Sequence, residues 1–185
     1  MSIAKKPTVI VVGGPAGTGK TTQGELLAKF LQCSFIEGDT LHPQSNIDKM
    51  ASGQPLTDDD RWGWLKKLSE ISSNAAINDS KQICVVSCSM LKKIYRTYIK
   101  NNSVDHDRLQ FRFVFLYSDF NDLVKRVNNR QGHYMKSDMV KSQYDIMEIP
   151  KDDELLENGG EGLAIDTLDK TSDEIFKELI EELKL

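Results

Sequence analysis

Eight residues near the N-terminus have the types and spacing needed to bind phosphate. Residues 14–21 read GPAGTGKT, which matches the pattern GxxxxGK[ST]. Glycines let a loop fold tightly with its backbone N–H groups pointing at phosphate oxygens, and the N-terminus of a following helix adds partial positive charge. The lysine of such a loop reaches the β- and γ-phosphates, and the last hydroxyl can bind Mg²⁺. The sequence therefore predicts a site for ATP and Mg²⁺.

The phosphate motif and the residue after it supply the predicted nucleotide contacts. Lys20 is also expected to be catalytic, and Thr21 is expected to bind the metal. The complete predicted set is Gly14, Pro15, Ala16, Gly17, Thr18, Gly19, Lys20, Thr21 and Thr22.

A second acidic group for the metal is less obvious. The strand predicted at 83–86 runs into Ser87 and Cys88, so it does not end in the usual aspartate. Glu37 and Asp39 follow another short predicted strand, and ligands collect at the carboxyl ends of parallel strands. Because Mg²⁺ usually keeps several waters, either carboxylate could hold its shell indirectly. Glu37 is the predicted metal residue.

Predicted strands and helices, which must position these groups, alternate along the chain. Buried-type apolar runs predict strands at 8–12, 34–36, 83–86, 111–116 and 163–165. Apolar residues at helical spacing predict helices at 20–31, 43–50, 62–76, 91–100, 121–130 and, after a capping box, from 171 onward. The alternation predicts a three-layer α/β domain on a parallel sheet, spanning 1–185. Long polar segments at about 40–61 and 131–150 are expected to be a binding insertion and a lid.

Composition narrows the class of protein. A chain of 185 residues with 39% hydrophobic and 28% charged residues is typical of one soluble domain. A net charge of −4 argues against a nucleic-acid partner. No apolar run approaches the ~20 residues that span a bilayer, and the first apolar run ends in the phosphate motif rather than a cleavage site, so neither a membrane partner nor a signal peptide is expected. The three cysteines form no metal or redox motif, which fits reduced thiols in the cytoplasm.

Several further motifs, in one order and spacing, resemble the small P-loop type of the gluconokinase family. They include FIEGDTLHP at 35–43, NIDKM at 46–50, GQPLTDDDR at 53–61, CSMLKKIYR at 88–96, RQGHYM at 130–135 and SQ at 142–143. The similarity runs from about residue 9 to 150. Two departures are Glu37, where the family often has Asp, and Tyr134, where Phe is common.

The resemblance implies a specific reaction. It implies ATP-dependent phosphorylation of D-gluconate at its terminal hydroxyl, which gives 6-phosphogluconate. It also implies the fold of the nucleoside-monophosphate and shikimate kinases, with a central five-stranded parallel sheet and a mobile lid. A homodimer is a further expectation from the resemblance.

The residues of the predicted acceptor site also suit a sugar acid. Arginine can grip a carboxylate through two hydrogen bonds, and histidine and glutamine can bind hydroxyls. Asp39 can orient the reacting hydroxyl or accept its proton, although phosphoryl transfer depends mainly on positioning and charge stabilisation. The predicted substrate-binding residues are Asp39, His42, Arg61, Arg96, His133 and Gln143; Asp39 is also predicted to be catalytic.

Each of these residues also has a plainer interpretation, without a role in the site. Arg61 follows three aspartates and could belong to a solvated charge cluster. Arg96 could lie on the exposed face of a basic helix, and His42 could simply cap the turn that starts at Pro43.

Two more arginines precede the predicted lid. Arg126 and Arg130 are four residues apart on the helix predicted at 121–130 and would share one face. We expect both to be catalytic by neutralising charge on the transferring phosphoryl group, while the lid excludes water. A solvated basic face is the plainer interpretation. Adenine is expected near residues 166–169, but no motif fixes its contacts.

Two other functions compete with the main prediction. One is a kinase for another small acceptor, such as a shikimate-like acid or a nucleoside monophosphate. The polar character of 40–60 argues against a base-binding pocket there. The other is a P-loop nucleotide switch without an acceptor, which would leave the His-Pro, Asp-Arg and Gly-His-Tyr-Met clusters unexplained.

Overall fold

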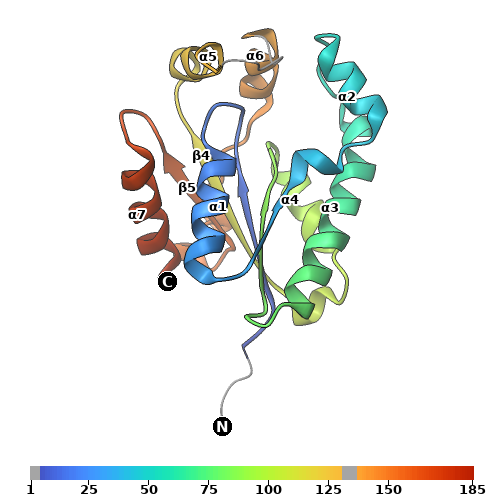
Figure 1. The fold of residues 1–185 in the computed structure, drawn as a ribbon, viewed down its shortest axis with the longest axis vertical. Coiled ribbons are helices and arrows are strands. Elements are labelled where there is room, and N and C mark those ends of the chain that lie inside the picture. Colours follow the sequence, from blue (N-terminus) through green and yellow to red (C-terminus); the bar gives the residue numbers. More distant parts are fainter. Residues whose placement is uncertain (1–4, 131–136) are drawn as a thin grey trace.

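Five parallel strands form the centre of the computed structural model, which describes residues 5–130 and 137–185 (Figure 1). The strands lie in the order β2-β3-β1-β4-β5. Their bounds are β1 Thr8–Gly13, β2 Ser34–Glu37, β3 Ile83–Ser87, β4 Gln110–Tyr117 and β5 Gly162–Asp166. Every neighbouring pair is parallel, so the predicted sheet and α/β class are confirmed.

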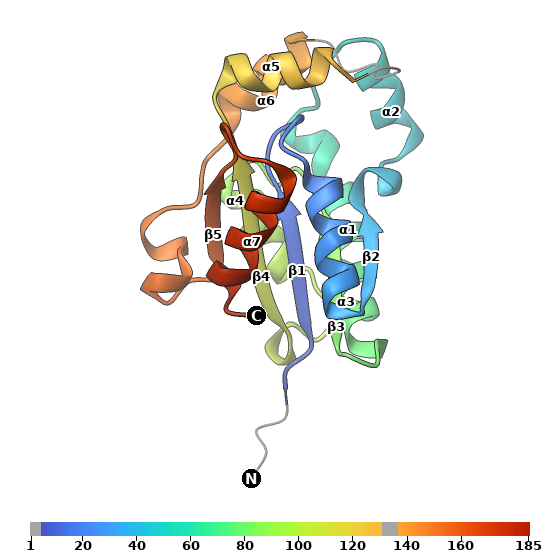
Figure 2. The same ribbon diagram turned by 60° about the vertical axis from the view of Figure 1, so that its left-hand side comes forward.

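Helices cover both faces of the sheet and its carboxyl edge (Figures 1 and 2). Helices α1 and α7 pack on one face, α3 and α4 on the other, and α2, α5 and α6 stand above the carboxyl ends of the strands. Their bounds are α1 Lys20–Leu31, α2 Gln44–Ala51, α3 Asp58–Asn78, α4 Lys93–Asn101, α5 Phe120–Asn128, α6 Ser137–Ile146 and α7 Ser172–Leu183. Short 3₁₀ turns occur at η1 Gly38–Leu41, η2 His106–Arg108, η3 Asp152–Glu154 and η4 Leu156–Asn158.

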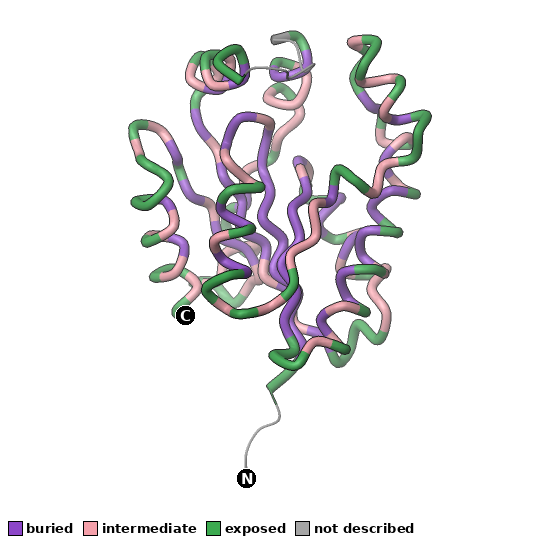
Figure 3. Tube along the Cα trace, viewed as in Figure 1, coloured by how far each residue is buried: buried purple, intermediate pink, exposed green. Residues whose placement is uncertain are grey.

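All six residues of β1 are buried (Figure 3), because their side chains alternate between two faces of the sheet that are both covered. Val9 and Val11 join the core beneath α3 and α4, whereas Ile10 and Val12 join the core beneath α1 and α7. With both faces apolar, polar chemistry is left to the ends of the strands. Among the described helices, none is long and apolar enough to cross a membrane.

Two of the differences from the predicted helix boundaries bear on the site. Helix α3 begins at Asp58, four residues before the predicted start at Trp62, because Thr57 and Asp60 cap it reciprocally. Helix α5 ends at Asn128, so Arg130 lies beyond the helix and does not share its face with Arg126. The predicted N-cap of the last helix is confirmed, since Thr171 Oγ1 accepts from the Glu174 N–H at 3.2 Å.

The segments that follow β1, β2 and β3 meet at the carboxyl edge. The Gly14 N–H donates to the Ser89 carbonyl at 3.1 Å, and the Gly38 N–H donates to Ser87 Oγ at 3.1 Å. A Cβ atom on Gly38 would lie 1.9 Å from the Ser87 carbonyl oxygen and 2.8 Å from Leu68 Cδ1. Only glycine allows this approach of two backbones, and the approach holds the residues after β2 against β3.

Gly38→Ala is therefore expected to destabilise the fold by about 1–3 kcal/mol through overpacking. The matched control is Gly63→Ala on the exposed side of α3, where an added Cβ meets nothing within 4 Å. The control should gain up to about 1 kcal/mol from helix propensity. Urea unfolding of both variants measures the difference. Equal stability of Gly38→Ala and the wild type would contradict the close packing.

Candidate active site

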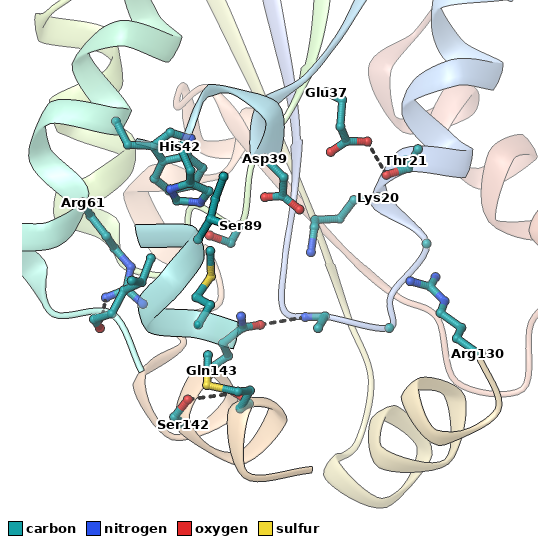
Figure 4. A pocket seen from close by; sticks show the side chains of 18 residues that line it. Lys20, Thr21, Glu37, Asp39, His42, Arg61, Ser89, Arg130, Ser142 and Gln143 are labelled. Carbon is teal, nitrogen blue, oxygen red and sulfur yellow. Dashed lines mark hydrogen bonds between the residues drawn. The ribbon is translucent and has the colours of Figure 1, made fainter. Parts of the chain in front are cut away.

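A cavity of about 400 Å³ opens at the carboxyl edge of the sheet (Figure 4). The phosphate loop forms one wall, η1, α2 and the start of α3 form the acceptor wall, and α6 closes the top. The polar residues that line it are Lys20, Thr21, Glu37, Asp39, His42, Arg61, Ser89, Arg130, Ser142 and Gln143. Residues distant in the sequence therefore share one chamber.

The phosphate loop leaves its helix end open for an anion. Gly14, Gly17 and Gly19 all have positive φ, which non-glycine residues rarely adopt. Gly19 is the N-cap of α1 and provides no side-chain cap, and the first turn carries no acidic residue. The first N–H groups of α1 thus lack a side-chain cap, as a phosphate-binding helix end requires.

Five of the nine predicted nucleotide contacts line the cavity and four do not. Ala16, Gly17, Gly19, Lys20 and Thr21 line the cavity. Gly14, Pro15 and Thr18 are buried in the loop itself, where Thr18 Oγ1 donates to the Pro15 carbonyl at 2.8 Å, and Thr22 is exposed on α1.

Lys20 faces the cavity from the start of α1. Its Nζ donates to the Gly14 carbonyl at 3.0 Å and to the Pro15 carbonyl at 3.3 Å, which holds the ammonium group over the loop. Burial lowers the pKa of Lys20, while the charge of Asp39 opposes that shift. This electrostatic coupling places the lysine and the predicted catalytic carboxylate in the same part of the cavity.

Glu37 bridges α1 and β3. Thr21 Oγ1 donates to its Oε2 at 2.5 Å, and Ser87 Oγ donates to its Oε1 at 2.5 Å. A threonine hydroxyl and a carboxylate side by side are oxygen groups that suit Mg²⁺, which otherwise keeps waters and binds phosphates. The described residues include no cluster of three or more His, Cys, Asp or Glu side chains that could hold a metal without a nucleotide. The arrangement fits a metal carried in with ATP.

Asp39 lies in η1, one turn beyond Glu37, and its side chain is exposed to the cavity. Within the described residues its carboxylate makes no hydrogen bond or ion pair. An exposed carboxylate near Lys20 is available to a hydroxyl that approaches the phosphate loop.

His42 is held in place by two neighbours. Its ring stacks on Trp64 with 3.9 Å between the ring centroids and an interplanar angle of 20°. Trp64 is buried and its Nε1 donates to the Gly38 carbonyl at 2.9 Å. The side-chain nitrogen of Asn46 lies 3.2 Å from His42 Nδ1. Burial lowers the pKa of His42 to about 4, so the ring is neutral at physiological pH.

Arg61 lines the cavity from the first turns of α3 and is only 6% exposed. Its Nη1 donates to the Leu56 carbonyl at 2.9 Å and to the Tyr95 hydroxyl at 3.1 Å. Tyr95 in turn donates to Asp58, which also pairs with Lys92. Arg61 is therefore not part of a solvated charge cluster, because it is buried and held by the tyrosine.

Arg96 does not line this cavity, and its predicted role in binding the acceptor has no support in the geometry. Its Nε and Nη2 pair with Glu154 at 3.0 and 3.2 Å, and its other bonds go to the carbonyls of Met90 and Glu148 at 2.9 Å. The side chain is 3% exposed, so the plainer surface interpretation is wrong as well. Arg96 ties the segment after α6 to the loop after β3.

Gln143 on α6 contacts the phosphate loop directly. Its Oε1 accepts from the Ala16 N–H at 2.9 Å, and the side chain lines the cavity beside Ser142 (Figure 4). Helix α6 packs on α5 through Val140, Leu123 and Val127. The lid segment thus rests on the loop that it is expected to cover.

The two arginines before the lid occupy different places. Arg130 lines the cavity and its charge contributes to lowering the pKa of Lys20. Arg126 is not among the lining residues; it pairs with Asp122 at 2.7 Å and donates to the Thr167 carbonyl at 2.9 Å. Its Nη1 also reaches the Gly17 carbonyl at 3.3 Å. Arg126 thus braces the phosphate loop, whereas Arg130 faces the chamber. His133 lies outside the described residues.

Apolar residues also line the cavity and were not predicted as site residues. Ile47 and Met50 on α2, Leu56 before α3 and Met139 on α6 all line the cavity. Their signal in the sequence is weak, because α2 is short and Ile47 and Met50 alone carry its i, i+3 spacing.

Comparisons with known proteins agree on the family. The model of the shikimate kinase family matches residues 16–184. A probable gluconokinase of Saccharomyces cerevisiae is 46% identical over 147 residues, covering 77% of this chain and 75% of the relative. The chain belongs to the gluconokinase family. The thermoresistant gluconokinase of Escherichia coli is 35% identical over 146 residues, covering 79% of each chain.

The fold of the chain is also similar to that of a solved gluconokinase structure. The crystal structure of a gluconokinase from Sinorhizobium meliloti 1021 is 37% identical, with a TM-score of 0.78, and the match covers 97% of this chain and 93% of that one.

Glu37→Gln tests the metal site. The amide keeps the shape of the bridge between Thr21 and Ser87 but removes the charge that favours a divalent cation. We expect Mg²⁺ to strengthen ATP binding less in the variant, by about tenfold or more, with metal-free ATP binding unchanged. Calorimetric titration of ATP with and without Mg²⁺ measures both values. An unchanged effect of Mg²⁺ would exclude Glu37 from the metal shell.

Proposed function

We propose that the protein transfers the γ-phosphoryl group of ATP to the terminal hydroxyl of D-gluconate, giving 6-phospho-D-gluconate. The observation that carries this proposal is one chamber with a phosphate loop on one side and a buried arginine, a neutral histidine and an exposed aspartate on the other. A donor site and a site for a polyhydroxy acid then share a single space.

The polarity of the acceptor wall orients the substrate in this proposal. Arg61 binds the carboxylate of gluconate, because within the described residues all its hydrogen bonds use Nη1 and its other nitrogens remain for a ligand. Asp39, which is coupled to Lys20, meets the hydroxyl at the opposite end of the substrate. His42 and Ser89 line the same chamber and can bind the hydroxyls that lie between the two ends of the substrate.

The reaction then depends on placement and charge. Lys20 and the N–H groups at the start of α1 stabilise the charge on the phosphates. Asp39 orients the acceptor hydroxyl and takes its proton as the new O–P bond forms and the bond from the γ-phosphorus to the bridging oxygen breaks, which releases ADP. Mg²⁺, held through Thr21 and Glu37, would neutralise phosphate charge when bound with ATP. Arg130 adds a positive charge to the lining of the chamber, and α6 excludes water that would otherwise hydrolyse ATP.

A reducing, cytoplasmic setting belongs to the same proposal. Cys84 and Cys88 are buried free thiols, and burial raises the pKa of each to about 12, so neither is suited to redox chemistry. The predicted homodimer stays a prediction.

An ADP-release assay with a panel of acceptors tests the substrate. With ATP and Mg²⁺, D-gluconate should stimulate ADP release, whereas sorbitol, which has the same hydroxyl chain but no carboxylate, should not. Shikimate and AMP, added in place of gluconate, test the two alternative acceptors, a shikimate-like acid and a nucleoside monophosphate. No gluconate-dependent ADP above the acceptor-free rate would reject the proposal, and equal rates with sorbitol would reject the role of Arg61.

Asp39→Asn tests the catalytic carboxylate. We expect kcat to fall at least about 100-fold, because the amide cannot accept the hydroxyl proton, while ATP affinity stays within error. The matched control is Asp107→Asn, whose side chain is 87% exposed in η2. Steady-state kinetics and ATP titration measure the two effects. Full activity of Asp39→Asn would assign the catalytic role to another group.

A further inference from the structure

We infer that Asn46 is a positioning residue that makes His42 a hydrogen-bond donor toward a hydroxyl oxygen of the acceptor. The inference rests on the proposed function, since it takes the chamber as the acceptor site. It assigns a role to the buried amide of Asn46, which is not among the predicted site residues.

The amide of Asn46 has a defined orientation. Asn46 is 3% exposed, and its Nδ2 lies 2.8 Å from the Asp60 backbone carbonyl and 3.2 Å from His42 Nδ1. A carbonyl oxygen only accepts hydrogen bonds, so the amide nitrogen, and not the amide oxygen, must face Asp60. One N–H then points to Asp60 and the other N–H points to the histidine.

The orientation of Asn46 decides where the proton of His42 lies. Nδ1 must accept the hydrogen bond from Asn46, so the neutral ring carries its proton on Nε2. No described residue hydrogen-bonds to Nε2. Protonation of Nδ1 would break the bond to Asn46 and place a charge in the stack with Trp64.

The charged groups around the ring do not reverse this assignment. Burial has the largest effect on the pKa of His42 and lowers it, which favours the neutral ring. The Asp39 carboxylate raises this pKa, and the charge of Arg61 lowers it. Behind Asn46, the Asp60 carboxylate is neutralised by Lys49 at 2.6 Å. The ring therefore stays neutral across the physiological range.

A neutral ring with Nε2–H has one function toward a ligand in the chamber. It donates a hydrogen bond to an oxygen lone pair and cannot take a proton at that nitrogen. His42 is thus a specificity group for a hydroxyl, and the proton of the reacting hydroxyl goes to Asp39.

The protonation state of the ring can be read directly from spectra of the wild-type protein. Proton–nitrogen correlation spectra of isotope-labelled histidine distinguish the two neutral tautomers and the charged ring. The chain has three histidines, and His42→Gln identifies the signal of His42. We expect the Nε2–H tautomer from about pH 8 down to about pH 5, below the ordinary histidine pKa. A dominant Nδ1–H tautomer, or a charged ring at pH 6.5, would overturn the inference.

Asn46→Asp supplies the functional test. A carboxylate facing Nδ1 accepts a hydrogen bond, so it holds a proton there and raises the pKa of His42. Below that pKa the charged ring still donates from Nε2; above it, the proton leaves Nε2 and the donor is lost. The KM for gluconate in the variant should therefore rise about five- to tenfold as the pH passes through that pKa, with kcat changing less.

Three comparisons separate this role from a structural one. The wild type and Asn74→Asp, which places the same change on the exposed face of α3, should show a flat KM between about pH 6 and pH 9. A KM of Asn46→Asp that is raised equally at every pH would indicate damage to the wall and overturn the assignment. If Asn46→Asp does not fold, the wild-type spectrum alone decides which tautomer His42 adopts.

Absence of gluconate turnover in the wild type would reject the proposed function, whereas the wrong tautomer of His42 in an active enzyme would reject only this inference.

Discussion

The carboxylate of Glu37 joins three parts of the fold on which the site depends. It accepts hydrogen bonds from Thr21 at the start of α1 and from Ser87 at the end of β3, while its own backbone ends β2. Ser87 also accepts from the Gly38 N–H, so the same hydroxyl holds the next residue of the chain. The position of the phosphate loop relative to the acceptor wall is thereby set by short polar contacts at one edge of an apolar sheet.

The acceptor wall continues from this junction through a chain of buried and partly buried contacts. Trp64 donates to the Gly38 carbonyl and stacks on His42, and Asn46 joins His42 to the backbone of Asp60. These contacts link η1, α2 and α3 into one surface. Hydrogen-bonded polar groups inside a protein hold one another rigidly, because breaking one bond leaves a desolvated group without compensation. Rigid placement is what a kinase needs to hold a hydroxyl in line with a phosphoryl group.

Much of this arrangement could be predicted from the sequence, because the strands are continuous apolar runs and the phosphate loop is a local motif. Glu37 and Asp39 follow a predicted strand, and the carboxyl ends of parallel strands meet at one edge of the sheet. The sequence therefore predicted that both residues would lie near the phosphate loop. Arg96 could not be placed in this way, because its partner Glu154 is 58 residues away and belongs to a turn without a recognised motif. Arg130 was assigned to a helix that ends two residues earlier, since spacing alone does not show where a helix stops.

The charges of the chamber explain how two anions can share it. Among the described lining residues, three cations face two carboxylates, and His42 is neutral. The cations are not placed together: Lys20 belongs to the phosphate loop, Arg130 follows α5, and Arg61 is buried in the acceptor wall beside Tyr95. In the proposed function, phosphate charge is therefore met on one side of the chamber and the acceptor carboxylate on the other. His42, being neutral, would bind a hydroxyl without attracting phosphate, so the proposed distribution of roles favours one orientation of a sugar acid, with its carboxylate away from ATP.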